Sequence, residues 1–102
     1  MTKQELWTLV HRGKSDQLEF KQSSAQLLRA GETLSAFMNG RGGQVLIGVR
    51  PDGSVIGQTI ADKTFQELAQ VLRRFDPPIP VETERIPVGA DGLEVLVLKF
   101  WS

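Results

Sequence analysis

The chain has 102 residues, of which 40% are hydrophobic, with twelve basic and twelve acidic side chains, one histidine and no cysteine. This length and apolar content predict one domain with one ordinary core, and they exclude a largely disordered chain. The lack of cysteine excludes disulfides, thiolate metal sites and cysteine nucleophiles, and it favours a reducing compartment. No apolar run approaches the ~18 residues of a membrane span and no secretory signal is present, so we expect a cytoplasmic protein without a membrane partner.

The charges are unevenly distributed although the formal net charge is zero. Residues 1–50 hold seven Lys and Arg against four acids, and residues 51–102 hold five against eight. If the fold gathers the first group on one face, a basic patch there can attract a polyanion. The alternative is that these charged side chains are ordinary solvated surface residues, and that the difference between the two halves arose by chance.

The first two predicted elements are a helix and a strand. Residues 2–11 place apolar side chains at helical spacing after Thr2, which can cap the helix. Residues 17–21 alternate apolar and polar side chains, which is typical of a half-buried strand. Glu19 and Lys21 therefore project from the same side of that strand.

The middle of the chain predicts a helix followed by a hairpin. The helix begins near Ser23 and ends near Asn39, because its apolar residues recur at helical spacing between these positions. A glycine-rich loop then leads into a buried strand at residues 44–50. A turn follows, and residues 54–57 are expected to form the partner strand.

The last part predicts one helix and two strands. The helix begins near Asp62, and the strands cover residues 81–88 and 93–101. The element order α-β-α-β-β-α-β-β predicts an α+β fold, with one mixed or antiparallel sheet and packed helices in a single domain over residues 1–102. The apolar ending at Trp101 leads us to expect that the domain is cut from a longer chain.

Three short segments stand out from the composition: Leu18–Lys21, Phe37–Gly43 and Arg50–Gly57. The second has three glycines in four positions, which can expose backbone N–H groups to a phosphate. It lacks the Gly-Lys-Ser/Thr of a Walker motif. The alternative is structural: Asn39, Gly42 and Gly43 form a tight loop into the strand, and at least one glycine has positive φ.

Together these segments resemble the AlbA-like DNA-binding domain of Schlafen proteins, which also occurs in many bacterial regulators and helicase-related proteins. The family pattern has an acid shortly before an "EFK" strand, then a helix ending in "FxNxxGG", then "xLxIGVxDxGxxxG". The chain matches it at Glu19-Phe20-Lys21, Phe37, Asn39, Gly42-Gly43, Leu46, Ile47-Gly48-Val49, Asp52-Gly53 and Gly57. The resemblance covers nearly the whole chain, about residues 5 to 100.

The resemblance also implies where a catalytic centre would lie. In nuclease-active Schlafens, two Glu and one Asp form a metal-dependent RNA-cleaving centre, and the second Glu and the Asp correspond to Glu19 and Asp52. Lys14 stands where the family has the first Glu. A lysine there repels a metal ion and pairs with Glu19 instead. We therefore expect a vestigial centre that holds Mg²⁺ or Mn²⁺ weakly at most, with no other cofactor and no efficient catalysis.

The positions of the basic residues favour electrostatic binding to the phosphate backbone of a nucleic acid. Lys14, Lys21, Arg41 and Arg50 lie in or beside the three segments, where each can neutralise a phosphate. Side chains that read bases are scarce, so binding to DNA or RNA should be largely insensitive to sequence. An alternative is that Lys21 and Arg50 form salt bridges with Glu19 and Asp52 and only solvate a strand face.

The resemblance and the bases together predict a nucleic-acid-binding domain of a bacterial transcriptional regulator or helicase-related protein. Two other functions stay open. One is a metal-dependent ribonuclease of Schlafen type, and the other is a protein-interaction or dimerisation module that forms a homodimer.

Overall fold

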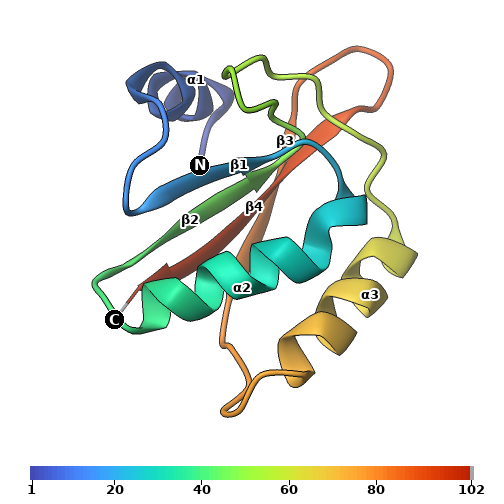
Figure 1. The fold of residues 1–102 in the computed structure, drawn as a ribbon. Coiled ribbons are helices and arrows are strands. Elements are labelled where there is room, and N and C mark those ends of the chain that lie inside the picture. The colour runs from blue at the N-terminus through green and yellow to red at the C-terminus, as the bar shows by residue number, and fades with distance from the viewer. Residues whose placement is uncertain (102) are drawn as a thin grey trace.

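A four-stranded mixed sheet with helices on both faces forms the framework of the computed structural model, which describes residues 1–101 (Figure 1). The strand order is β1-β2-β4-β3, in which β1 and β2 are parallel and the other neighbours are antiparallel. This confirms the predicted α+β class. The elements are α1 (Lys3–Arg12), β1 (Leu18–Lys21), the 3₁₀ turn η1 (Ser24–Gln26), α2 (Leu27–Met38), β2 (Gly42–Ile47), α3 (Asp62–Arg73), β3 (Glu82–Pro87) and β4 (Glu94–Trp101).

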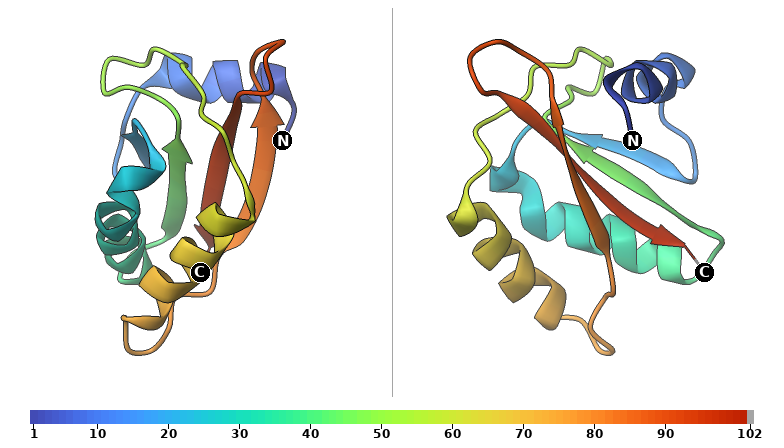
Figure 2. Two further views of the ribbon diagram at one scale, coloured as in Figure 1. Left: turned by 90° about the vertical axis from the view of Figure 1, so that its right-hand side faces the viewer. Right: turned by 180° about the vertical axis from the view of Figure 1, so that it is seen from behind.

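Side chains of the central strands alternate between two apolar clusters. Leu96 and Leu98 of β4 face α2 and α3, whereas Val95 and Val97 face α1. All four are fully buried. As Figure 2 shows, α2 and α3 lie together on one side of the sheet and α1 lies on the other. The nearly continuous apolar run in β4 is therefore explained by cover on both faces.

The helices begin and end near the predicted residues. The Thr2 hydroxyl accepts a hydrogen bond from the Glu5 N–H at 3.1 Å and caps α1. In α2 the apolar stripe contains Gly31, where a Cβ would lie 2.9 Å from side-chain atoms of Val71 and Phe75. This glycine thus allows α2 and the end of α3 to pack closely.

Two predictions about the hairpin in the middle of the chain are wrong. β2 begins at Gly42, two residues before the predicted start, and ends at Ile47. Residues 54–57 form no strand and contribute only a single bridge, Val49 to Val55. The cause lies at Gly48, whose φ of +109° turns the backbone out of the strand.

Within residues 1–101, none of the helices is long and apolar enough to span a membrane.

Candidate nucleic-acid interface

Gly42 and Gly43 of the second segment are the first two residues of β2. Because they have no side chain, other elements pack close to the strand there. Gly42 has φ +91°, which favours glycine, and a Cβ there would lie 2.7 Å from Trp101 Cα. A Cβ on Gly43 would lie 2.7 Å from the Gln17 carbonyl oxygen and 2.8 Å from the Phe37 ring. The expected positive φ is thus found at Gly42. Because both glycines belong to a paired strand, close packing accounts for them without a phosphate.

Asn39 ends the helix that precedes these glycines. It is the C-cap of α2, and its backbone N–H donates to the Ala36 carbonyl oxygen at 3.1 Å. The loop between α2 and β2 is therefore shorter than predicted, since only Asn39, Gly40 and Arg41 separate the two elements.

The fold places the two acids of the implied metal centre on different elements, Glu19 in β1 and Asp52 in the turn that follows β2. Glu19 lies beside Val45, which packs in the core under α2. The turn that carries Asp52 follows the end of β2, and a Cβ on the adjacent Gly53 would lie 3.5 Å from Val10 of α1. In the described part of the chain, no group of three or more His, Cys, Asp or Glu is placed to hold a metal ion.

Glu19 is paired with the lysine that replaces the family acid. Its Oε1 lies 3.8 Å from Lys14 Nζ and accepts a hydrogen bond from the Phe20 N–H at 2.9 Å. The lysine therefore supplies the positive charge beside Glu19, as expected from its position in the sequence.

Asp52 has a local role in its turn. Its Oδ1 accepts a hydrogen bond from the Ser54 N–H at 2.9 Å. The Ser54 hydrogen bonds, helped by the nearby charge of Arg50, hold the pKa of Asp52 below its ordinary value. Neither Lys21 nor Arg50 forms an ion pair within residues 1–101, so the alternative in which they form salt bridges with Glu19 and Asp52 is not found there.

The four predicted phosphate contacts are spread along β1 and β2. Arg41 directly precedes β2, at the end of the sheet where the parallel strands β1 and β2 begin, which we call the start end. Lys14 lies beside β1, because the chain turns back between Ser15 and Leu18 and Lys14 Nζ is 3.8 Å from Glu19 Oε1. Lys21 is the last residue of β1, two residues after Glu19, and Arg50 follows the end of β2. Arg41 and Arg50 are therefore separated by the length of β2, roughly 20 Å.

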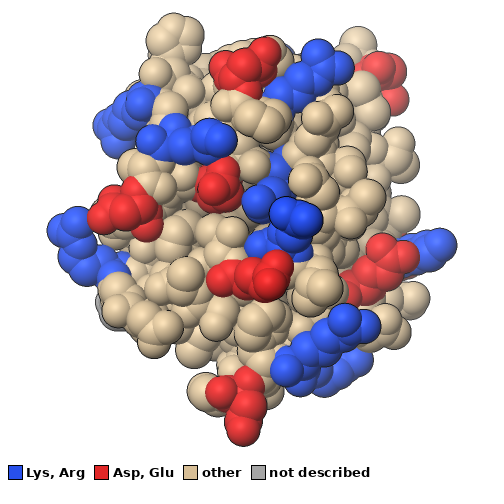
Figure 3. Space-filling view, in the orientation of Figure 1, with Lys and Arg blue, Asp and Glu red and all other residues tan. Residues whose placement is uncertain are grey.

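Charges on the face seen in Figure 3 are mixed in sign. Basic and acidic side chains alternate across it, and no large area carries one sign alone. At the start end, Arg41 Nη2 lies 4.0 Å from Asp16 Oδ2, and these side chains are 80% and 83% exposed. An ion pair so open to water contributes little, about 0 to 1 kcal/mol, so its acid is readily exchanged for another anion.

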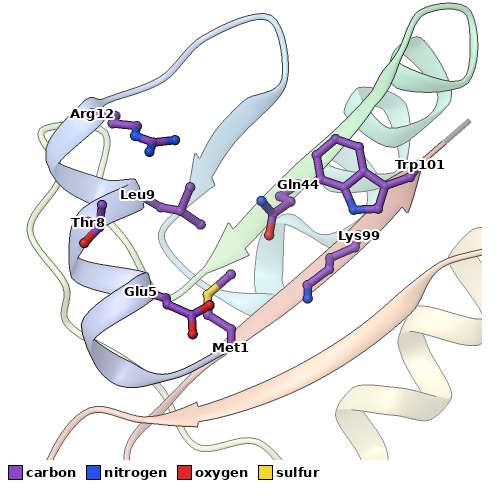
Figure 4. Close-up of a pocket in the computed structure, with 8 residues that line it drawn as sticks. All are labelled: Met1, Glu5, Thr8, Leu9, Arg12, Gln44, Lys99 and Trp101. Atoms are coloured by element: carbon purple, nitrogen blue, oxygen red, sulfur yellow. The ribbon is translucent and has the colours of Figure 1, made fainter.

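The start end also contains a hollow that was not predicted. It lies between α1 and the sheet, has a volume of about 380 Å³, and is shown in Figure 4. Its lining residues are Met1, Glu5, Thr8, Leu9, Arg12, Gln44, Lys99 and Trp101. A smaller hollow beside it shares Leu9, Arg12, Gln44 and Trp101 and continues to Ser15 and Gln17. The two form one groove along the start end, which we call the α1 groove.

Polar and aromatic groups converge on the α1 groove. The indole of Trp101 is exposed, while the Gln44 Oε1 is buried and has no hydrogen-bond partner among residues 1–101. Lys99 pairs with Glu84, whereas Arg12 has no ion pair within the described residues. A cation, an aromatic ring and an amide whose oxygen is buried and unpaired among the described residues therefore line one cavity.

This groove could not be predicted from the sequence, because its lining residues lie far apart in the chain. Arg12 and Trp101 come together only because the antiparallel register pairs Trp101 with Gly42 beneath the end of α1. The one available signal was a large aromatic residue at the end of an apolar strand.

Comparison with known proteins identifies the fold family. The family model described as Schlafen, AlbA_2 matches residues 14–100. No curated protein matches the chain. The matched range contains β1, the glycines, and Gln44 and Lys99 of the groove, whereas α1 precedes it.

Proposed function

We propose that this chain, which belongs to the Schlafen AlbA_2 family, binds nucleic acid at the start end of its sheet. One observation carries the proposal: three basic residues and an exposed tryptophan gather there. Arg12 and Trp101 line the α1 groove, Lys14 follows Arg12 by two residues, and Arg41 precedes the glycine that pairs with Trp101. Family membership is consistent with this function.

Phosphate binding at this end requires the partly buried Glu19 and the exposed Asp16 to be displaced from their bases. Lys14 and Arg41 are held by Glu19 and Asp16 at 3.8 and 4.0 Å, distances typical of weak pairs. A phosphodiester that replaces these acids also releases condensed counterions, which adds salt-dependent affinity. We therefore propose that affinity comes from the backbone, with DNA or RNA as the partner.

The wider role follows from the same proposal. A domain that binds nucleic acid with little sequence preference suits a transcriptional regulator or a helicase-related protein, in which other parts supply specificity or motion. Cleavage is not part of the proposal, because Lys14 is paired with Glu19 and Asp52 is hydrogen-bonded within its own turn.

Fluorescence anisotropy tests the proposal. A labelled single strand of about ten nucleotides is titrated at several salt concentrations with wild type and with the double variant Arg12→Gln/Arg41→Gln. If each base neutralises one phosphate, the slope of log affinity against log salt falls by about 1.4 for the pair. The control is Arg73→Gln/Arg74→Gln, which removes two exposed bases at the end of α3.

We expect the control to bind like wild type. Binding that ignores salt, or that is lost in the α3 control but kept in the start-end variant, would refute the proposed function.

A further inference from the structure

We propose that the α1 groove takes a single unstacked nucleobase, stacked on Trp101 and held at its edge by Gln44, with the adjoining phosphate at Arg12. This inference rests on the proposed function, because the base belongs to the bound strand. It adds a site that reads bases to a protein whose other contacts are to the backbone.

The first argument is the exposed indole of Trp101, which lines the groove. Trp101 is 54% exposed and borders three hollows, although its backbone is fixed in the sheet. Its partner across the strands is Gly42, so β2 offers no side chain to cover the indole. An exposed ring on a rigid strand is a suitable stacking surface, since every base has a π-face.

The second argument is an unsatisfied polar atom. The Oε1 of Gln44 is buried and accepts no hydrogen bond within the described residues. Leaving such an acceptor unpaired is unfavourable, and because the oxygen is covered, a ligand donor in the groove reaches it when the amide turns toward the groove. A glutamine amide offers a donor beside an acceptor, and this pattern matches the edge of adenine.

The third argument is the placement of charge along the groove. Arg12 and Glu5 are seven residues apart on α1, so they lie roughly 10 Å apart on one face of the helix. Figure 4 shows Glu5 beside Met1 and Arg12 at the opposite end of the lining. The phosphate therefore belongs at the Arg12 end, because Glu5 would repel it at the other.

The size of the hollow agrees with this ligand. Its volume of about 380 Å³ lies at the lower end of the range for small-molecule sites, roughly 300 to 1,000 Å³. Leu9 of α1 also lines the groove, so a base on the indole would have an aliphatic side chain nearby. The groove accommodates one nucleotide, and the rest of a strand must lie outside it.

Intrinsic fluorescence provides a direct test because the chain has two tryptophans and no tyrosine. Trp7 lies on α1 and is 41% exposed, but it does not line the groove. The variant Trp7→Phe leaves Trp101 as the only indole, and Trp101→Phe leaves Trp7. Each is titrated with single strands of deoxyadenosine and of thymidine of equal length.

We expect the adenine strand to quench the fluorescence of Trp7→Phe and to leave that of Trp101→Phe nearly unchanged. In anisotropy, Trp101→Leu should weaken adenine-strand binding roughly tenfold, as expected for one lost stacking contact. Trp101→Phe should recover part of that loss. Gln44→Leu should reduce the preference for adenine over thymine.

The outcomes separate this inference from the proposed function. If strands bind with the expected salt dependence but Trp101 is not quenched and Trp101→Leu binds normally, the base site is wrong and the proposed function stands. If no strand binds at low salt, both are wrong.

Discussion

The two faces of the sheet use the same strands but differ in how completely helices cover them. On one face α2 and α3 bury a continuous cluster that includes Leu34, Val45 and Leu98. On the other, α1 covers only part of the strands, and polar Gln44 and Lys99 replace apolar residues at the start end. Both faces have an apolar core, but the α1 face leaves part of the sheet open to solvent at the start end, where we propose that nucleic acid binds.

The largest expected effect comes from the covered face. Leu34 of α2 is fully buried, so Leu34→Ala should lower the free energy of unfolding by about 2 to 5 kcal/mol. Urea denaturation measures this change. At temperatures where the variant is folded, its affinity for nucleic acid should equal that of wild type, and a matching loss of affinity would contradict the separation of the two faces.

The next largest effect is expected at Gly42, the first residue of β2 at the start end of the sheet. Gly42→Ala places a Cβ at φ +91°, against the backbone of β4, and should cost about 1 to 3 kcal/mol or more. Gly40→Ala is the matched control, since a Cβ there meets its nearest atom, the Phe37 carbonyl oxygen, at 3.8 Å. Thermal unfolding of the two variants should differ clearly, and equal melting temperatures would show that the strain is absent.

A smaller, pH-dependent effect is expected from the polar side of the partly covered face. Hydrogen bonds from Lys99 and the N-terminal amino group hold the pKa of Glu84 below its ordinary value of 4.5. The carboxylate therefore stabilises the fold above that value, and this contribution disappears as the pH falls through the lowered folded pKa. Glu84→Gln should be about 1 kcal/mol less stable at neutral pH and equal to wild type in strong acid.

The control for this pair is Glu82→Gln. Glu82 is opposite Lys99 in the register but has no ion pair in the described part of the chain. Replacing the Glu82 carboxylate should leave the free energy of unfolding unchanged both at neutral pH and in strong acid. A pH-dependent effect of equal size in Glu82→Gln would show that general surface charge, and not the pair with Lys99, is responsible.

The smallest effect on stability is expected at Trp101 itself. Because more than half of its side chain is exposed, Trp101→Leu should change the free energy of unfolding by no more than about 0.5 kcal/mol. Urea denaturation tests this alongside Leu34→Ala. A large loss of stability would mean that the indole is part of the core and not a binding surface.

Much of the fold could be predicted from the sequence because local signals set it. The Thr2 cap, the alternation in β1 and the spacing in α2 all depend on near neighbours. The strand expected at residues 54–57 failed because the glycine-dependent turn at Gly48 carries the chain away from regular pairing, which a short apolar stretch does not reveal.

The candidate site could be predicted only in part because it depends on register and topology. Arg41 directly precedes β2 at the start end, and Lys14 lies beside β1 next to Glu19. The strand β2 places Arg50 at its far end from Arg41, and sequence proximity cannot show this. Gln44 and Trp101 become neighbours only through the pairing of β2 with β4.

The most direct test of the central claim is to map the bound strand on the protein. Backbone amide chemical shifts are recorded during titration with a single-stranded oligonucleotide. The claim predicts that the amides that shift belong to Leu9, Arg12, Gln44 and Trp101, with those of α3 unchanged. Shifts that concentrate on α3, or at the end that holds Lys21 and Arg50, would contradict it.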